Sequence, residues 1–351
     1  MTAARGSLAA LARQIEEAGA SAILNIGGHE VPVSNLDKRL WPGRSKRELL
    51  AYLARISPWL LPHLAGRPVA VTRFPNGIAG KSFWQKVWGS PPKFVKTVTI
   101  WSVDGDTARD YLLCANLPTL LWLGQQAALE IHVWFSSTLA GRDGRGLGTQ
   151  YGTSEDALEQ SRLNYPDFIV FDLDPYLYSG REAAGEEPEL YRPAFKRART
   201  LALDLRDIAA TLGMDAFVKT SGRTGLHLYL PIRRRFTFTE VRAMAETIGR
   251  HLRSRHPRDV TLEWAVERRT GKIFFDYNQN VRGKSLAAAF SPRRHAQATV
   301  SMPLTWEELE RSYPTDFTIV TAPGILADRG DPWADILDAR ADLATEIERA
   351  G

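Results

Sequence analysis

The stretch Phe168-Ile-Val-Phe-Asp-Leu-Asp-Pro175 decides the fold of this chain. Its apolar residues predict a buried strand that ends at the proline. Because residues i and i+2 of a strand face the same side, Asp172 and Asp174 point one way, while Phe171 and Leu173 point the other way. Two carboxylates so close together repel each other unless a cation lies between them. Their place at the carboxyl end of a strand is typical of the mouth of a cleft.

A third carboxylate extends this pair. Asp276 lies in a second apolar strand, Ile273-Phe-Phe-Asp-Tyr-Asn278, where an aspartate is costly unless something pairs with it. Three carboxylates with no cysteine beside them predict a hard ion that prefers oxygen ligands, Mg²⁺ or Mn²⁺. Two alternatives stay open at this point: the first two aspartates could simply cap the next turn, and metal-dependent nucleases use such pairs as well. The carboxylates therefore indicate phosphoryl chemistry without giving its direction.

Helical and strand patterns alternate on both sides of this strand, which predicts an α/β or α+β class. Helices are expected at 8–15, from Ser45 (with Ser45 and Glu48 as a capping box), from Asn116 to about Leu129, at 188–213 and 239–255, from Thr305 and from Pro332. Strands are expected at 31–33, 69–74, 131–135, 216–220, 226–232, 272–278 and 285–291. Residues 138–166 are rich in glycine and have no apolar rhythm, so they predict a long loop.

Composition excludes several classes of protein. The chain has 351 residues, of which 44% are hydrophobic, enough for one large domain or two fused lobes. Cys114 is the only cysteine, so neither an internal disulfide nor a cysteine-based zinc site can form, and a reducing cytosol fits. The first twenty residues lack the apolar run of a signal peptide, and no stretch reaches the ~18 apolar residues of a membrane span. We therefore expect a cytoplasmic protein with no membrane partner.

Charge and aromatic residues favour nucleic acid as a partner. The formal net charge is +5, although on charge alone an ordinary basic soluble protein is the slightly favoured alternative. Basic residues flank an aromatic pair: Arg73, Lys81 and Lys86 surround Phe83 and Trp84. This pattern is typical of base stacking over a charged groove, and a solvated basic face is the alternative. The Gly-Lys-Ser of residues 80–82 does not complete a P-loop, because Pro75 occupies the position of the first glycine.

A glycine-rich turn joins the strands expected at 216–220 and 226–232. Gly222 and Gly225 allow backbone N–H groups to approach a phosphate closely. Hydroxyl donors and positive charge come from the neighbouring side chains, namely Ser221, Thr224, Lys219, Arg223 and His227. The segment is typical of a cradle for a triphosphate, although a plain turn is the alternative when the segment is taken alone. No Lys-x-Asp-Gly motif is present, so the chain is not expected to be a ligase itself.

Seven segments together resemble the polymerase domain of bacterial ligase D and the related stand-alone primase–polymerases of the archaeo-eukaryotic primase superfamily. They are SNLDKRLWP (34–42), RFPNGIAGKSFWQK (73–86), LEIHVW (129–134), PDFIVFDLDP (166–175), KTSGRTGLHLYLPI (219–232), FFDYNQNVRGKSLAAAFSPR (274–293) and VSMPLTWEEL (300–309). The resemblance implies a catalytic core of two packed mixed sheets with flanking helices. It places a catalytic domain at 26–311, with a helical extension at 1–25 and a helical tail packed on the domain at 312–351.

The resemblance also assigns roles to residues of this chain. Asp172, Asp174 and Asp276 match the family's metal carboxylates. The residues expected at the incoming nucleotide are Lys219, Ser221, Gly222, Arg223, Thr224, His227, Arg269, Gln279 and Arg293, with His132 beside them. Those expected at the template are Phe83, Trp84 and Lys86, and those expected at a downstream 5′-phosphate are Asn35, Lys38 and Lys46.

Three departures from the family pattern bear on these roles. Thr224 stands where ligase D domains often have lysine, so Arg223 becomes the candidate to supply that charge. Lys46 is not cleanly aligned with the second lysine of the phosphate pocket. The stretch 138–166 is longer than ligase D domains suggest.

The implied reaction is attack of a primer 3′-hydroxyl on the α-phosphate of an NTP or dNTP, assisted by two Mn²⁺ or Mg²⁺ ions. Membership of the family would imply a preference for ribonucleotides, gap filling in DNA break or excision repair, and a separate DNA ligase and repair factors as partners in the bacterial nucleoid. A metal-dependent nuclease and a non-catalytic module that bridges DNA ends are the rival interpretations. The triphosphate cradle disfavours the nuclease, and the intact carboxylates disfavour the bridging module.

Overall fold

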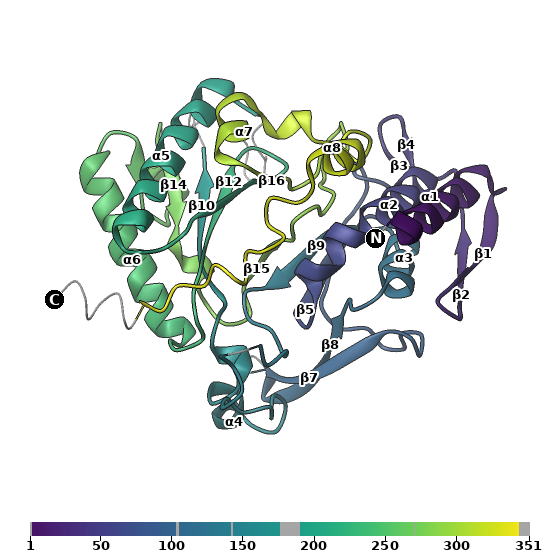
Figure 1. Cartoon of the computed structure of the whole chain (residues 1–351), viewed down its shortest axis with the longest axis horizontal. Helices are drawn as coiled ribbons and strands as arrows, with labels where there is room; N and C mark the ends of the chain where they lie inside the picture. Colours follow the sequence, from purple (N-terminus) through teal and green to yellow (C-terminus); the bar gives the residue numbers. More distant parts are fainter. Residues whose placement is uncertain (1, 103–104, 142, 176–189, 270, 344–351) are drawn as a thin grey trace.

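FIVFDLDP forms a central strand of one of two six-stranded sheets in the computed structural model, which describes residues 2–102, 105–141, 143–175, 190–269 and 271–343 (Figure 1). The catalytic sheet has the strand order β13-β14-β10-β12-β11-β16. Its strands are β10 (Phe168–Asp174), β11 (Phe217–Thr220), β12 (Leu226–Pro231), β13 (Val260–Thr261), β14 (Ile273–Asp276) and β16 (Pro303–Leu304). The β13–β14 pair is parallel and the other pairs are antiparallel, so this sheet is mixed as expected.

The second sheet has the order β15-β9-β5-β8-β7, and β6 pairs with β5 at one end. Its strands are β5 (Pro68–Arg73), β6 (Phe83–Gln85), β7 (Lys96–Ser102), β8 (Thr107–Leu113), β9 (Ala128–Trp134) and β15 (Ser285–Ala287). All its described pairs are antiparallel, so the expectation of a mixed sheet is wrong here. Two small hairpins complete the strands: β1 (Ser21–Ile26) with β2 (His29–Ser34), and β3 (Arg39–Trp41) with β4 (Arg44–Ser45).

Helices cover the outer sides of the two sheets. In Figure 1, α5 and α6 lie against the catalytic sheet, and α2 and α3 lie beside the second sheet. The helices are α1 (Thr2–Glu17), α2 (Lys46–Leu64), α3 (Leu117–Gln125), α4 (Glu155–Glu159), α5 (Arg192–Thr211), α6 (Phe238–Arg255), α7 (Trp306–Arg311) and α8 (Ala322–Arg329). The capping boxes at Ser45 and Thr305 are confirmed. No helix in the described ranges is long and apolar enough to cross a membrane.

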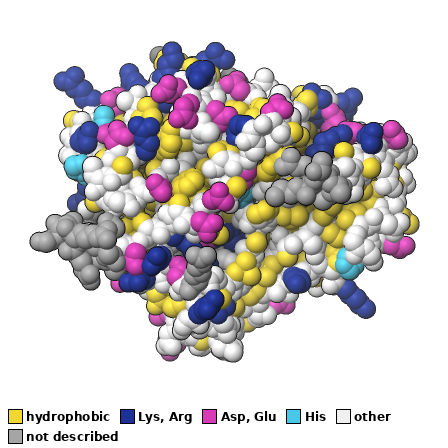
Figure 2. Space-filling view, viewed as in Figure 1, with side chains coloured by type: hydrophobic (Ala, Val, Ile, Leu, Met, Phe, Trp, Pro, Cys, Tyr) yellow, Lys and Arg dark blue, Asp and Glu magenta, His cyan; other side chains and the backbone are white. Residues whose placement is uncertain are grey.

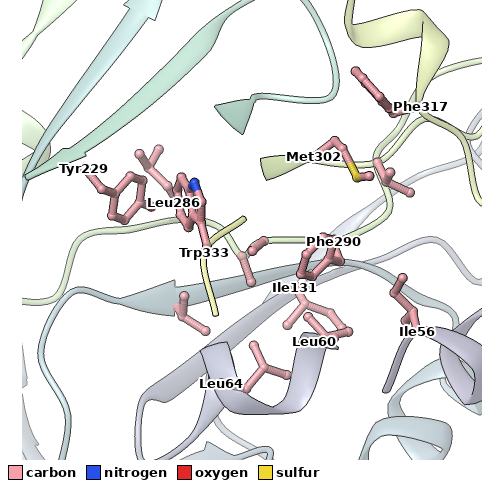
Figure 3. Packing of buried hydrophobic residues seen from close by; sticks show 14 of the residues in the cluster. Ile56, Leu60, Leu64, Ile131, Tyr229, Leu286, Phe290, Met302, Phe317 and Trp333 are labelled. Carbon is pink, nitrogen blue, oxygen red and sulfur yellow. The ribbon is translucent and has the colours of Figure 1, made fainter. Parts of the chain in front are cut away.

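One apolar cluster joins the two sheets. Figure 3 shows side chains from α2 (Ile56, Leu60 and Leu64), β9 (Ile131), β12 (Tyr229) and the C-terminal segment (Trp333) packed in this region. Figure 2 shows hydrophobic side chains across the middle of one face, with lysine and arginine around its edges. Because charges of both signs are spread over this face, any preference for an acidic partner must come from local clusters of cations.

The C-terminal segment differs from the expected helix at Pro332. Residues 332–338 form consecutive turns, and the last long helix, α8, comes before them. Tertiary packing decides this conformation, because Trp333 is buried with its ring 5.0 Å from that of Tyr229. Asp331 lies 2.7 Å from His63 Nε2 of α2, and Ala341 bridges to Ile232 just after β12. The segment therefore contacts elements on the sides of both sheets.

A buried carboxylate anchors the same region. Asp167, directly before β10, is fully buried and lies 2.8 Å from Arg67 Nη2 and 2.7 Å from Arg234 Nε. Arg340 Nη1 lies 3.4 Å from Asp167 and 2.9 Å from Asp143. Burial acts to raise the pKa of Asp167, but the surrounding arginines hold it below its usual value. The cluster joins the start of β5, the end of β12, the loop at 138–166 and the C-terminal segment.

Other boundaries also differ from the sequence expectations. Strands β1, β7 and β8 were not expected, and α3 ends at Gln125 rather than near Leu129, because Ala127 adopts a left-handed conformation (φ 55°) before β9. The loop at 138–166 contains the short helix α4, whose N-cap is Ser154. The expected helix start at Pro188 lies outside the described residues, and α5 begins at Arg192.

Candidate active site

Four polar side chains form a row across the catalytic sheet. Asp172 of β10 lies opposite Asp276 of β14 on one side and opposite His227 of β12 on the other. His227 in turn lies opposite Lys219 of β11. Directly opposed residues on neighbouring strands face the same side of a sheet, so the row lines one face, while alternate residues such as Leu173 pack in the core.

The three aspartates repel one another in this arrangement. Burial and then the charges of Asp174 and Asp276 raise the pKa of Asp172 well above its usual value. For Asp174, burial and the charge of Asp276 raise the pKa to about 6. Burial also raises the pKa of Asp276, although the Asn278 N–H and the Gln279 amide, each donating at 2.9 Å, partly offset it. Such mutual repulsion is what a bound cation would relieve.

The donor set fits a hard divalent ion. Asp172 Oδ1 is buried and accepts no hydrogen bond from any described residue. The available ligands are carboxylate oxygens, which Mg²⁺ and Mn²⁺ prefer. Over the described ranges, no three histidine, cysteine or carboxylate side chains already converge as a metal site. The three aspartates are therefore neighbours whose oxygen atoms an ion would draw together.

Lys219 lies at one end of the row and is buried. Its side chain is fully buried, and Nζ lies 2.7 Å from His227 Nδ1 and 2.5 Å from Ser301 Oγ. Burial and the charge of Arg293 lower the pKa of Lys219 well below its usual value. His227 Nε2 lies 3.4 Å from Asp172 Oδ1. Lys219 thus positions His227, and its expected contact with a phosphate stays a prediction.

The glycine turn packs too closely for side chains at its glycines. Gly222 has φ +75°, and a Cβ atom there would lie 2.5 Å from Arg293 Cγ. A Cβ atom at Gly225 would lie 2.5 Å from the Leu173 carbonyl oxygen. Ser221 Oγ accepts hydrogen bonds from the N–H groups of Arg223 (3.2 Å) and Gly225 (3.0 Å). Two of the turn's N–H groups therefore already have acceptors, and the turn is held against β10.

A buried carboxylate that the sequence analysis did not single out organises the opposite wall. Glu130 of β9 accepts hydrogen bonds from Arg293 Nε (3.1 Å) and from the Arg294 N–H (3.0 Å). Its other oxygen lies 3.7 Å from His132 Nε2, and the His132 ring lies 4.8 Å from that of Trp84. Burial acts to raise the pKa of Glu130, but Arg293 and His132 hold it far below its usual value. The available signal was its alternation with His132 in LEIHVW.

Gln279 contacts the carboxylate row directly, whereas Arg269 affects it through its charge. Gln279 donates directly to Asp276 Oδ2. Arg269 is buried, lies 3.4 Å above the Phe274 ring, and donates to the carbonyls of Glu263 and Trp264. Its charge lowers the pKa of Asp174 without a direct contact. Both residues therefore lie near the row, and their contact with the nucleotide stays a prediction.

A pocket of about 300 Å³ brings nine of the predicted residues together, and Asp276 lies outside its lining. Both sheets line it, with Trp84, His132, Asp172, Asp174, Ser221, Arg223, Thr224, His227 and Arg293 joined by Ser285, Leu286 and Ala287. Phe83 and Trp84 are 46% and 50% exposed, which excludes the alternative that both rings belong to the core. Lys86 is exposed and lies beyond the pocket along the same strand direction.

The residues predicted for a 5′-phosphate lie together, but only two of them are accessible. The Lys38 N–H donates to the Asn35 carbonyl, and the Lys46 N–H donates to the Lys38 carbonyl. Asn35 and Lys38 are exposed, and Lys38 Nζ donates to Asn76 Oδ1 at 3.1 Å. Lys46 is buried, and its Nζ donates to the carbonyls of Ser34 and Gln125. Lys46 therefore holds internal structure rather than an exposed anion site.

Comparison with known proteins gives the family. The family model described as "LigD, primase-polymerase domain" matches residues 45–333. The chain belongs to the LigD primase–polymerase family. The resemblance and the fold class are thereby confirmed, and the chain is a nucleotidyltransferase of the primase–polymerase class.

Individual relatives agree with this assignment. The chain is 30% identical over 332 residues to the multifunctional non-homologous end joining DNA repair protein LigD of Mycobacterium tuberculosis, covering 91% of this chain and 38% of that protein. It is 31% identical over 337 residues to the LigD of Pseudomonas aeruginosa, covering 95% and 35%. The polymerase domain of Mycobacterium tuberculosis ligase D, solved in complex with DNA, superposes with a TM-score of 0.72 and 29% identity over 88% of this chain and 98% of that chain. The chain thus spans less than half the length of these LigD proteins.

Proposed function

We propose that this chain extends the 3′ end of a DNA primer with NTPs or dNTPs and fills short gaps at DNA breaks. One observation carries the proposal: a single pocket is lined by Asp172 and Asp174 together with Arg223 and Arg293. A pocket that combines carboxylates with guanidinium groups suits a metal–triphosphate complex, because carboxylates bind the metal ions and guanidinium groups bind the phosphates.

The residues around the pocket have different proposed roles. Asp172, Asp174 and Asp276 would hold two Mn²⁺ or Mg²⁺ ions, which when bound supply charge neutralisation at the phosphates and activation of a hydroxyl. Gln279 orients Asp276 through its hydrogen bond. Arg293, fixed by Glu130, aims its guanidinium into the pocket toward a phosphate.

Template and sugar contacts complete the proposal. The exposed rings of Phe83 and Trp84 stack on the template base, and the exposed Lys38 holds a downstream 5′-phosphate. A preference for NTPs over dNTPs follows if the pocket hydrogen-bonds the 2′-hydroxyl, because its absence would leave a polar group unpaired.

The biological setting is proposed from the relatives. The LigD proteins of Mycobacterium tuberculosis and Pseudomonas aeruginosa are named for non-homologous end joining, and the matched solved domain was in complex with DNA. This chain covers 38% and 35% of those two proteins. From these names we propose break repair as its pathway, in the bacterial nucleoid, with a DNA ligase activity and further repair factors acting alongside it.

The experiment is primer extension on a gapped duplex with Mn²⁺, with and without NTPs. Wild type should lengthen the primer only with NTPs, and Asp172→Asn or Asp276→Asn should abolish extension while DNA affinity is retained. Asp207→Asn, an exposed carboxylate paired with Arg206, is the matched control. Shortening of the DNA without NTPs would establish the nuclease instead. DNA binding with no extension by wild type would favour the bridging module.

A further inference from the structure

A second, larger groove opens beside the catalytic pocket. It has a volume of about 1010 Å³ and lies between the β7–β8 hairpin with α4 on one side and α6 with the segment 278–284 on the other. We call it the Lys284 groove. Its charged lining residues are Lys86, Arg242, Arg282, Lys284 and Glu159. Among the residues that the structure describes here, four cations against one carboxylate make this groove attractive to a polyanion.

Two of these cations are available to a ligand. Lys86 and Lys284 are exposed, and within the described ranges neither ammonium group has a hydrogen-bond or ion-pair partner. By contrast, Arg242 donates twice to Asn278 Oδ1, and Arg282 donates to Asn164 Oδ1. The uncharged part of the lining combines hydrogen-bonding groups with apolar and aromatic side chains. The hydrogen-bonding groups are Ser102, Thr237, Thr239, Asn164, Asn278 and Asn280, and the apolar and aromatic ones are Trp101, Tyr111, Trp134, Leu158, Phe238 and Val281. Unpaired lysines beside amides and hydroxyls are the groups that contact phosphate and sugar oxygens.

The groove leads directly to the catalytic carboxylates. The Asn278 N–H donates to Asp276 Oδ1, and the charge of Lys284 lowers the pKa of Asp276. Ser285, the residue after Lys284, already lines the catalytic pocket. A nucleic-acid strand bound in the Lys284 groove would therefore have its end at the catalytic carboxylates.

A different groove reaches the catalytic pocket from the other end. It has a volume of about 1040 Å³, no described residue of its lining is a carboxylate, and its basic residues are Arg39, Arg192, Arg223, Arg294 and His295. It shares Arg223 and Thr224 with the catalytic pocket and includes Asn76, the partner of Lys38. We call it the Arg39 groove.

Positions along β10 show on which side of Asp172 each of the two grooves lies. Asn280, in the Lys284 groove, bonds to the backbone of Val170, two residues before Asp172. The glycine turn, at the Arg39 groove, lies against Leu173, one residue after Asp172. On the opposite wall, Asn76, Trp84 and Lys86 follow the same order from the Arg39 groove through the catalytic pocket to the Lys284 groove. The two grooves thus approach the carboxylates from opposite directions.

We propose that the Lys284 groove binds the sugar–phosphate backbone of the upstream primer strand, with Lys86 and Lys284 as phosphate contacts. Lys86, which the family resemblance assigns to the template, is thereby assigned to the primer, because it lines this groove and not the catalytic pocket. This assignment rests on the proposed polymerase function. In gap filling, the upstream primer and the downstream strand must approach the reacting phosphate from opposite directions. Since Lys38 and Asn76 place the downstream end at the Arg39 groove, the primer occupies the other groove, and its 3′-hydroxyl reaches Asp276.

The test compares two DNA ligands in the full chain without NTPs. One is a recessed primer–template duplex, and the other has the same template strand annealed only to a 5′-phosphorylated downstream strand. The variant is Lys86→Gln with Lys284→Gln. The control is Lys93→Gln with Lys96→Gln, two exposed lysines outside all three pockets with the same change in charge. Affinity is measured by fluorescence anisotropy over a range of salt concentrations, with melting temperatures to confirm folding.

The Lys86/Lys284 variant should bind the primer–template roughly tenfold more weakly, with the salt slope reduced by about two, and bind the downstream ligand like wild type. The Lys93/Lys96 control should match wild type on both. Unchanged primer–template affinity in the variant, or an equal loss on both ligands, would overturn the groove assignment. Failure of the polymerase proposal shows separately, as absence of NTP-dependent extension by wild type. That result leaves the binding comparison of the two ligands readable.

Discussion

Replacing Asp174 with asparagine should stabilise the metal-free protein at neutral pH while removing its activity. In the folded chain, burial and the charge of Asp276 raise the pKa of Asp174 from 3.8 to about 6. A shift of this size corresponds to about 3 kcal/mol of unfavourable free energy once the carboxyl is ionised. Asparagine keeps the shape of the side chain and carries no charge, so it removes this cost.

The pH dependence of this stabilisation follows from the difference between the pKa of Asp174 in the folded and in the unfolded chain. A carboxyl whose folded pKa is raised favours the folded state below its unfolded pKa, and that contribution is lost as the pH rises through the folded value. The stabilisation by Asp174→Asn should therefore be largest at pH 7.5 and fall to about half at pH 5. At pH 7.5 with a chelator present, the melting temperature should rise by roughly 5 °C.

With Mn²⁺ added, wild type should melt at a higher temperature than the Asp174→Asn variant. The ion stabilises wild type by binding the folded state and should stabilise the Asp174→Asn variant much less. Asp207→Asn is the control, because Asp207 is exposed on α5 far from the carboxylate row. If Asp174→Asn melts at or below the wild-type temperature at pH 7.5 in chelator, or if the difference does not shrink at pH 5, the assigned repulsion is wrong.

Three further predictions address the rest of the site. Phe83→Ala and Trp84→Ala should each weaken template binding by roughly 1–3 kcal/mol with little change in melting temperature, because both rings are exposed; a loss of stability typical of a core aromatic would contradict this. Glu130→Gln should raise the KM for NTP roughly tenfold with a smaller change in kcat, since Arg293 loses its charged partner; steady-state kinetics at saturating DNA measure the split. Lys38→Ala should remove the preference for a gap with a downstream 5′-phosphate, whereas Lys46→Met should lower the melting temperature, and gel-shift titrations of both gap types with thermal melts separate the two effects.

The features of the candidate site that depend on residues close in sequence could be predicted from the sequence. The period of two placed Asp172 and Asp174 on one face, and the glycine turn between two strands was recognisable from Gly222 and Gly225. The cross-strand row could not be derived in the same way. Which residue lies opposite Asp172 depends on the register of β14 and β12, and those strands are distant in sequence.

Burial accounts for the residues whose roles changed. Lys219 and Lys46 both look like free cations in the sequence, but each ammonium group is buried against internal acceptors. Glu130 looks like one polar residue in an apolar strand, and only the fold brings Arg293 to it, 163 residues later. The C-terminal turns were missed because long-range packing of Trp333, rather than local propensity, decides their conformation.

The C-terminal segment also contributes a connection between the two sheets that form the walls of the catalytic pocket. It fastens to α2 through Asp331 and His63 and to the end of β12 through Ala341, so it spans from one wall to the other. A chain cut after residue 330 would keep every residue named in the catalytic pocket and would lose this span. The apolar cluster and the Arg67–Asp167 pair would still join the two sheets, with one connection fewer between them. Groups carried by different sheets, such as Asp172 of β10 and His132 of β9, would keep their chemistry but be held less firmly at their separation.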